Sequence, residues 1–307
     1  MDTLIIMNNF TQKIVPHLWF DKEARQAAEF YTSIFPNSKM GFSVTLPGTP
    51  SGNAEIVNFT IMNYEVASIS AGPFFKMNPS ISLMVNFDPS QDPEAATRID
   101  EIWNALVEGG KVLMPIGEYS FCKRYGWLQD RFGNSWQLLL TDPVGDERPL
   151  IMPGLLFTEA VCGKADEAMS FYESVFKGSK RGQTAYYPAG MPNDKEGTVM
   201  FSEIKIGDQW LVAMDSGEAH GYTFNEGVSL IVNCDSQEEM DYFYDHLSAV
   251  PEAEQCGWIK DKYGVSWQIV PYEMNEMMAT TDKEKFKRMS DAMLEMKRLD
   301  VEKLKNA

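Results

Sequence analysis

Apolar and polar positions in the first part of the chain follow two different periods. Residues 13–20 alternate with the two-residue period of a β-strand, and residues 21–35 carry apolar side chains at helical spacing. Strand patterns then follow at about 40–46, 54–62 and 65–71. This first segment is therefore predicted to form a βαβββ unit.

The same order of periods returns in the residues that follow. The pattern predicts a strand over residues 81–87 and an amphipathic helix over residues 93–108, which ends at a pair of glycines. Three shorter strand patterns complete the unit, at 111–115, 126–129 and 134–140. Residues 11–142 are therefore predicted to form two consecutive βαβββ units.

One twelve-residue segment occurs twice in the chain. Gly126-Trp-Leu-Gln-Asp-Arg-Phe-Gly-Asn-Ser-Trp-Gln137 returns as Gly257-Trp-Ile-Lys-Asp-Lys-Tyr-Gly-Val-Ser-Trp-Gln268. Each copy is typical of a β-hairpin with glycine in the turn. Because neighbouring strand residues point to opposite faces, Gln137 and Gln268 are predicted to face away from the tryptophans beside them.

The duplication extends over most of the 307 residues. The offset between the copies falls from 147 residues at Ser82 and Ser229 to 131 at Gln137 and Gln268, so the second copy is 16 residues shorter before its hairpin. A repeat this long indicates duplicated domains. We predict one module at residues 11–145 and a second at residues 149–274, joined by a turn-rich segment at 141–148.

The C-terminal residues 280–307 are predicted to form one amphipathic helix. Phe286, Met289, Met293 and Met296 have the spacing of a single apolar face, and charged residues surround them. Such a helix packs on its own domain or contacts a partner, and the first alternative is the more common.

Composition limits the partners and the compartment. The net charge of −17 leaves no surplus of Lys and Arg for a nucleic-acid backbone or an anionic membrane. The four cysteines form no CxxC pair, and the chain shows neither a secretory signal nor an apolar stretch long enough to span a membrane. The sequence therefore predicts a cytoplasmic protein with reduced thiols and with neither nucleic-acid nor membrane partners.

Several of these segments resemble a known family. They are Trp19-Phe-Asp, the Ala-Ala-Glu-Phe-Tyr-Thr-Ser-Ile-Phe-Pro-Asn-Ser-Lys that ends at Lys39, the Ser-Leu-x-Val-Asn strands, and Cys256-Gly-Trp with the hairpin after it. They look like the PhnB-like branch of the vicinal oxygen chelate superfamily, which includes glyoxalase I, bleomycin-resistance proteins and extradiol dioxygenases. The resemblance covers about residues 12–272, and the tail is also typical of that branch.

The resemblance implies an α+β fold of tandem vicinal-oxygen-chelate modules. Each module is expected to consist of two βαβββ units that form a curled, half-open mixed sheet, with helices on the convex face and a ligand cavity on the concave one. The fused modules would make an internal pseudo-dimer, because each curled sheet leaves an edge that a second module can cover. A homodimer of the whole chain is a further possibility.

Enzymes of this superfamily bind a divalent metal through four strand positions, usually His and Glu. In this sequence the four positions fall on Val15 and Met152, near Asn58 and Ser202, near Ser80 and Gly227, and on Gln137 and Gln268. A register shift of two residues would substitute His17 or Ser82. No combination contains two histidines and a carboxylate, and a glutamine carbonyl lacks the charge that offsets ion dehydration. We therefore predict no metal site.

A neutral polar pocket is the alternative that these positions favour. The predicted ligand-binding residues are His17, Trp19, Asn58, Ser82, Gln137, Ser202, Ser229 and Gln268. Each also has a plain structural interpretation: His17 as a buried histidine with a satisfied ring, Trp19 as a core residue, and the amides as groups bonded to neighbouring strands. Catalytic residues are not identifiable from the sequence.

The PhnB-like branch has also carried the description of a demethylubiquinone methyltransferase. S-adenosylmethionine usually binds at a glycine-rich turn between a strand and a helix of a parallel sheet. The chain contains neither GxGxG nor GxGxxG, and the βαβββ order differs from that of a doubly wound sheet. We predict no cofactor and do not expect methyl transfer.

The predicted function is therefore binding of a small-molecule ligand without a metal. The alternatives are a metal-dependent or His17-based lyase, isomerase or oxygenase of the same superfamily, and an assembly protein whose second module is only structural. Module one is expected to hold the ligand, because it carries His17, Trp19 and Asn58. The residues that only module one has, including Tyr119, Cys122, Lys123 and Arg124, are expected to form a lid or, alternatively, a surface loop.

Overall fold

The computed structural model describes residues 12–141 and 148–307. Module one contains two βαβββ units, as predicted. The first comprises β1 (Ile14–Phe20), α1 (Ala24–Ile34), β2 (Lys39–Thr49), β3 (Gly52–Ile61) and β4 (Tyr64–Ser70), and the second comprises β5 (Ile81–Phe87), α2 (Ala95–Val107), β6 (Lys111–Tyr119), β7 (Cys122–Gln129) and β8 (Ser135–Leu140).

Module two repeats this order with one strand fewer in its second half. Its elements are β9 (Ile151–Phe157), α3 (Ala165–Val175), β10 (Lys180–Tyr186), β11 (Val199–Ile206) and β12 (Gln209–Asp215), followed by β13 (Val228–Cys234), α4 (Gln237–Leu247), β14 (Trp258–Lys260) and β15 (Ser266–Pro271). The described chain has no counterpart of β6 between α4 and β14. The 16-residue difference between the modules therefore corresponds to a missing edge strand.

The strands form two open mixed sheets, which confirms the α+β class. Sheet A has the order β14-β15-β13-β1-β4-β3-β2, and sheet B has the order β10-β11-β12-β9-β5-β8-β7-β6. Helix α1 packs on β3, α2 on β7 and β8, α3 on β11 and α4 on β15.

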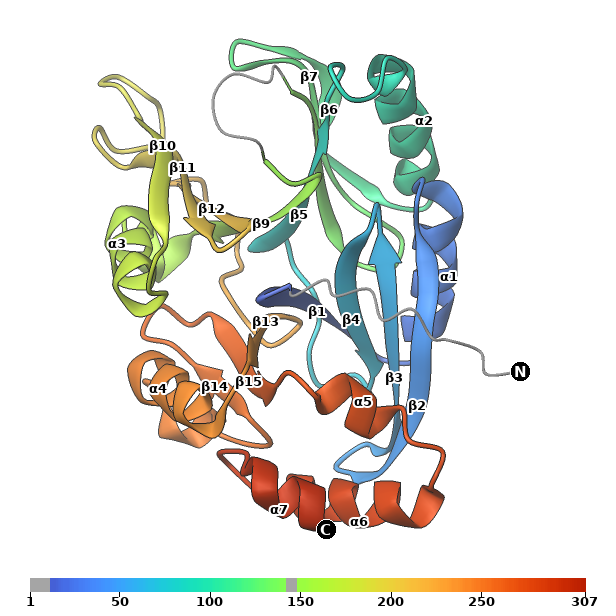
Figure 1. The fold of residues 1–307 in the computed structure, drawn as a ribbon. Helices are drawn as coiled ribbons and strands as arrows, with labels where there is room; N and C mark the ends of the chain where they lie inside the picture. Colours follow the sequence, from blue (N-terminus) through green and yellow to red (C-terminus); the bar gives the residue numbers. More distant parts are fainter. Residues whose placement is uncertain (1–11, 142–147) are drawn as a thin grey trace.

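Each sheet combines one unit from each module, whereas the sequence predicted each sheet within one module. Strand β1 pairs antiparallel with β13, and β5 pairs antiparallel with β9. Figure 1 shows the blue strands of the first unit beside the orange strands of the last, and the two middle units side by side. The exchange is possible because every unit presents its first strand as an open edge, and these edges are equivalent.

The repeated hairpin holds each helical layer to its sheet through a buried aspartate. Asp130 Oδ2 accepts hydrogen bonds from the Tyr31 hydroxyl at 2.7 Å and from Trp136 Nε1 at 2.8 Å. Its Oδ1 accepts from the backbone N–H groups of Phe132 and Asn134. The second copy repeats these contacts at Asp261, with Tyr172, Trp267, Tyr263 and Val265.

Trp136 and Trp267 are fully buried in the core, and Gln137 and Gln268 beside them face the other side of each sheet. The facing predicted for Gln137 and Gln268 is thus what the structure shows. The cavity described below lies on the glutamine side of sheet A.

The C-terminal tail is not the single helix that the sequence predicted. It forms α5 (Met274–Met278), α6 (Lys283–Leu294) and α7 (Val301–Asn306). Helix α6 ends because the chain must turn at Met296 and Lys297 to pair with the edge of sheet A. There the carbonyls of Met296 and Lys297 each accept a backbone hydrogen bond of 2.8 Å, from Cys256 and Gly257 respectively. Asp300 then caps the next helix by accepting from Lys303 N.

Candidate functional site

A row of small and polar side chains crosses the middle of sheet A. His17 on β1 lies in register with Ser229 on β13 and with Ala67 on β4. Asn58 on β3 is the next residue in the same row, opposite Ala67. Residues in one row of a sheet share a face, so these side chains from both modules point the same way.

The polar part of this row is linked by hydrogen bonds between the modules. Gln268 Nε2 donates to Ser229 Oγ at 2.9 Å, and Ser229 Oγ lies 3.4 Å from His17 Nδ1. Ser229 Oγ accepts from the amide, and which atom donates in its contact with His17 depends on the tautomer of the ring. Burial lowers the pKa of His17 to about 3, so the ring is neutral near pH 7.

A cavity of about 590 Å³ opens above this row, a size typical of small-molecule sites. Its lining is mostly apolar, and His17, Asn58 and Gln268 supply polar groups at its floor. Trp19 lies two residues beyond His17 on the same face of β1. Its ring centroid is 5.0 Å from Phe75 and 6.2 Å from Trp258, so one end of the cavity is aromatic.

The C-terminal tail forms the wall opposite the sheet. Sheet A curls, and the tail connects its two edges: α6 packs on β2, while residues 296 and 297 bond to the segment before β14. In Figure 1 the red helices lie across the open side of sheet A. The tail residues that line the cavity are Met274, Asn275, Met278, Met293, Leu294 and Leu299. Methionine side chains adapt to ligands of different shape.

The end of the cavity near α5 contains a carboxyl group held by two amides. Glu65 Oε1 accepts from Asn275 Nδ2 at 3.0 Å and from Asn58 Nδ2 at 3.4 Å. Burial raises the pKa of Glu65, and the hydrogen bond from Asn275 opposes that rise. Glu65 and Trp19 therefore define the two ends of one cavity, and Asn58 and His17 lie between them.

The corresponding face of sheet B is filled with side chains. Gly154 occupies the position that His17 has in module one, and a Cβ there would lie 2.9 Å from Met84 Sδ. Met84, Met152, Trp210 and Val212 form a buried cluster on this face. Gln137 accepts a hydrogen bond of 2.9 Å from the Tyr125 hydroxyl, and Ser82 bonds to Ser135 at 2.8 Å. Protein groups thus satisfy both predicted site residues of this sheet.

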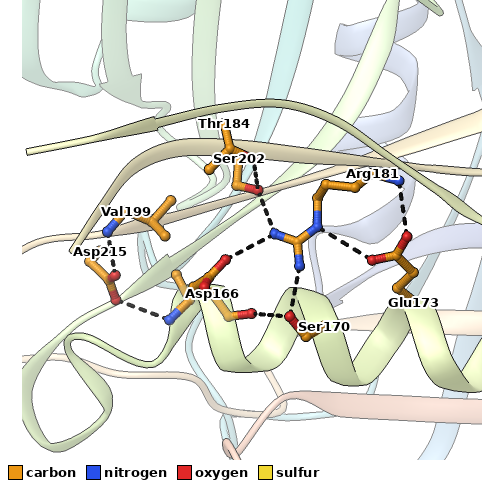
Figure 2. A network of polar contacts seen from close by, with 9 residues as sticks. Asp166, Ser170, Glu173, Arg181, Thr184, Val199, Ser202 and Asp215 are labelled. Atoms are coloured by element: carbon orange, nitrogen blue, oxygen red, sulfur yellow. Dashed lines mark hydrogen bonds and ion pairs between the residues drawn. The ribbon is translucent and has the colours of Figure 1, made fainter. Parts of the chain in front are cut away.

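Ser202 lies on the helix side of sheet B, away from the concave face. Figure 2 shows its hydroxyl bonded to Arg181 and Thr184, each at 3.0 Å, within a network that continues to Asp166 and Ser170 of α3. The predicted equivalence of Ser202 with Asn58 is one residue out, because the row His17–Ala67–Asn58 of sheet A corresponds to Gly154–Val212–Glu203 in sheet B. A shift of one residue moves a side chain to the other face. The buried residue on the concave side is Glu203, which pairs with Arg148.

The segment that only module one possesses does not cover the cavity. Tyr119 and Cys122 face each other at the end of the β6–β7 hairpin, and Arg124 pairs with Asp100 of α2. None of these residues is among those that line the cavity. The predicted lid is therefore wrong, and so is the alternative of a surface loop: the residues belong to β6, the edge strand of sheet B, and to β7 beside it.

The structure thus places five of the eight predicted residues on sheet A and three elsewhere. His17, Trp19, Asn58 and Gln268 line the cavity, and Ser229 is buried beside Gln268 without lining it. Sequence reasoning missed Trp258, Glu65 and Asn275. Alternation could have identified Trp258, which pairs in register with Gln268, whereas nothing in the sequence relates Asn275 to Glu65.

The donor set does not fit a divalent metal of the kind this fold binds. Around His17 the neighbouring donors are the neutral groups of Ser229 and Gln268, and the carboxylate of Glu65 is engaged by two amides. Within residues 12–141 and 148–307, no three His, Cys, Asp or Glu side chains gather where they could hold a metal ion. Neutral donors of this kind do not offset the free-energy cost of dehydrating a divalent ion, because they bring no negative charge.

The paired βαβββ units and the cavity on a curled mixed sheet define a tandem protein of the vicinal oxygen chelate superfamily. Family comparison then identifies the branch: a family model described as 3-demethylubiquinone-9 3-methyltransferase matches residues 12–139 and again residues 149–270. The chain belongs to this PhnB-like family, with one copy in each module. No functionally curated protein matches the chain.

Solved structures similar to the chain include proteins that match less than half of it and one that matches most of it. A PhnB protein from Bacillus cereus is 32% identical over 42% of this chain and 100% of its own, with a TM-score of 0.37. A protein from Pseudomonas aeruginosa is 21% identical over 41% of this chain and 96% of its own, with a TM-score of 0.33. Glyoxalase I from Zea mays is 12% identical over 84% of this chain and 93% of its own, with a TM-score of 0.52, which shows a shared fold.

Helices of the described residues are all too short or too polar to cross a membrane.

Proposed function

We propose that this protein reversibly binds one small, largely apolar molecule in the cavity of sheet A. The observation that carries the proposal is the cavity itself, about 590 Å³ in volume, apolar over most of its lining and bounded by a row of neutral hydrogen-bonding groups. Such a combination supplies affinity through burial and orientation through a few polar contacts.

The polar groups of the floor suit a binding role better than acid–base catalysis. With its pKa lowered to about 3, His17 is a weak proton acceptor at neutral pH. His17, Asn58 and Gln268 line the cavity and can orient a hydroxyl or carbonyl of a ligand without transferring protons. The methyl transfer in the family description finds no support in this chain, which lacks the glycine-rich turn of a dinucleotide-type cofactor site.

The test uses 4-(1-naphthyl)butan-1-ol, which has a flat apolar body and one hydroxyl group, and isothermal titration calorimetry. The parent protein should bind one probe per chain. Ala67→Phe places an aromatic ring on the cavity floor, where Ala67 lies between His17 and Asn58, and should weaken binding at least 10-fold.

Gln137→Ala is the matched control, because Gln137 occupies the equivalent position on the filled face of sheet B. It should leave the probe's dissociation constant within about twofold of the parent value. Binding that survives Ala67→Phe unchanged, or that is lost only with Gln137→Ala, would contradict the assignment of the site to sheet A.

A further inference from the structure

The charged side chains that line the cavity are all of one sign. Glu65, Glu226 and Glu252 belong to the lining, and no described residue of the lining is Lys or Arg. Lys260 neutralises Glu226 in an ion pair of 2.6 Å. Within the described chain, neither Glu65 nor Glu252 takes part in an ion pair, and the residues outside it contribute no Lys or Arg side chain.

Glu65 is the one of these carboxyl groups that is half-buried and forms no ion pair among the described residues. Its Oε1 is bonded to Asn275 and Asn58, which fixes the orientation of the group on the cavity wall. The amides satisfy one oxygen but bring no positive charge. A positively charged group of a ligand would therefore bind more tightly here, because the carboxylate is already oriented and partly desolvated.

The aromatic end lies at a defined distance from this carboxylate. Glu65, Ala67 and Ile69 follow one another on the same face of β4, and Trp19 lies in register with Ile69. Same-face neighbours on a strand are roughly 6.6 Å apart, so Trp19 is about 13 Å from the level of Glu65. Trp19, Phe75 and Trp258 present ring faces and edges there, a suitable wall for a flat apolar group.

We propose that the cavity selects an amphiphilic organic cation, with its apolar or aromatic body at Trp19 and its ammonium group at Glu65. The inference rests on the proposed binding function and narrows it to one class of ligand. An anion of the same shape would face Glu65 without any cationic side chain in the described lining. The overall charge of −17 adds long-range attraction for cations.

Three probes of one shape test the proposal: 4-(1-naphthyl)butylamine, 4-(1-naphthyl)butan-1-ol and 4-(1-naphthyl)butanoic acid. Each carries a naphthyl group and a four-carbon chain, a length close to the distance between the two ends of the cavity. By calorimetry at pH 7.5 the amine should bind about 10-fold tighter than the alcohol, and the acid more weakly than the alcohol. Glu65→Gln keeps an acceptor for Asn275 and should weaken amine binding about 10-fold more than it changes alcohol binding.

Glu276→Gln is the control for net charge, because Glu276 belongs to α5 and its side chain is exposed. It should change amine binding by less than twofold. An amine that binds no tighter than the alcohol, or that is insensitive to Glu65→Gln, would overturn the cation proposal while the binding function stands. Failure of the alcohol itself to bind would overturn the binding function, and the cation proposal with it.

Discussion

At the scale of single residues, a buried neutral histidine makes stability depend on pH. The pKa of His17 is about 3 in the folded protein, against about 6.5 for an unperturbed histidine. Between these values the unfolded chain binds a proton that the folded chain does not. The contribution of His17 is therefore fully present above about pH 6.5 and is lost progressively as the pH falls toward 3.

Replacing His17 with glutamine should reduce this acid sensitivity. Between pH 7 and pH 5, the fall in the free energy of unfolding should be smaller in His17→Gln than in the parent by about 2 kcal/mol, measured by urea denaturation. His246→Gln removes an exposed histidine of α4 and should leave the pH dependence of the parent. Equal pH dependence in His17→Gln and the parent would show that the ring is not held neutral.

The two glutamines of the repeated hairpin show what the sequence pattern could and could not predict about single residues. Alternation along β8 and β15 correctly set Gln137 and Gln268 on the faces opposite their tryptophans. It could not tell which glutamine meets an open cavity. That difference depends on distant side chains: Met84 fills the space at Gly154 in sheet B, whereas His17 and Ala67 leave room above sheet A.

At the scale of elements, the tail replaces a strand that module two lacks. In sheet B, β6 lies at the edge next to β7. In sheet A, the tail bonds to the segment before the equivalent strand β14 and at the same time forms a wall of the cavity. Apolar spacing predicted helix in this tail but not the break at residues 295–300, because the break depends on hydrogen bonds to residues about 40 positions earlier.

Release of the tail should therefore impair binding. Leu299 is 1% exposed and packs beside Gly257, so Leu299→Asp would bury an unpaired carboxylate at the docking point. We expect faster tryptic cleavage between Lys283 and Lys305, and at least 10-fold weaker binding of 4-(1-naphthyl)butan-1-ol. Asn306→Asp introduces the same charge at an exposed position and is the control. Unchanged probe affinity in a Leu299→Asp protein with a cleavable tail would show that the tail is not part of the site.

At the scale of the whole molecule, the fold class and the duplication were predictable because the strand and helix periods are strong and occur twice. The exchange of units between the two sheets was not predictable, since each of the four units begins with an equivalent first strand. Their pairing depends on the total packing of two sheets, and no local pattern encodes it. The site is accordingly shared: module one supplies His17 and Asn58, module two supplies Trp258 and Gln268, and the tail supplies a wall.

This shared site makes a prediction about the divided chain. Residues 1–144 and 145–307, produced separately, should each fail to bind 4-(1-naphthyl)butan-1-ol with the parent affinity, because β1 then lacks β13 and the cavity lacks either its floor or its wall. Mixing the two halves should restore binding as a one-to-one complex, detected by calorimetry and size-exclusion chromatography. Two copies of the first half could also pair with each other, with β1 of one copy beside β5 of the other. Gln137 would then take the place of Gln268, and the tail would be absent.

Parent-like affinity in the first half alone would therefore show that the second module only supports the site and contributes nothing to it.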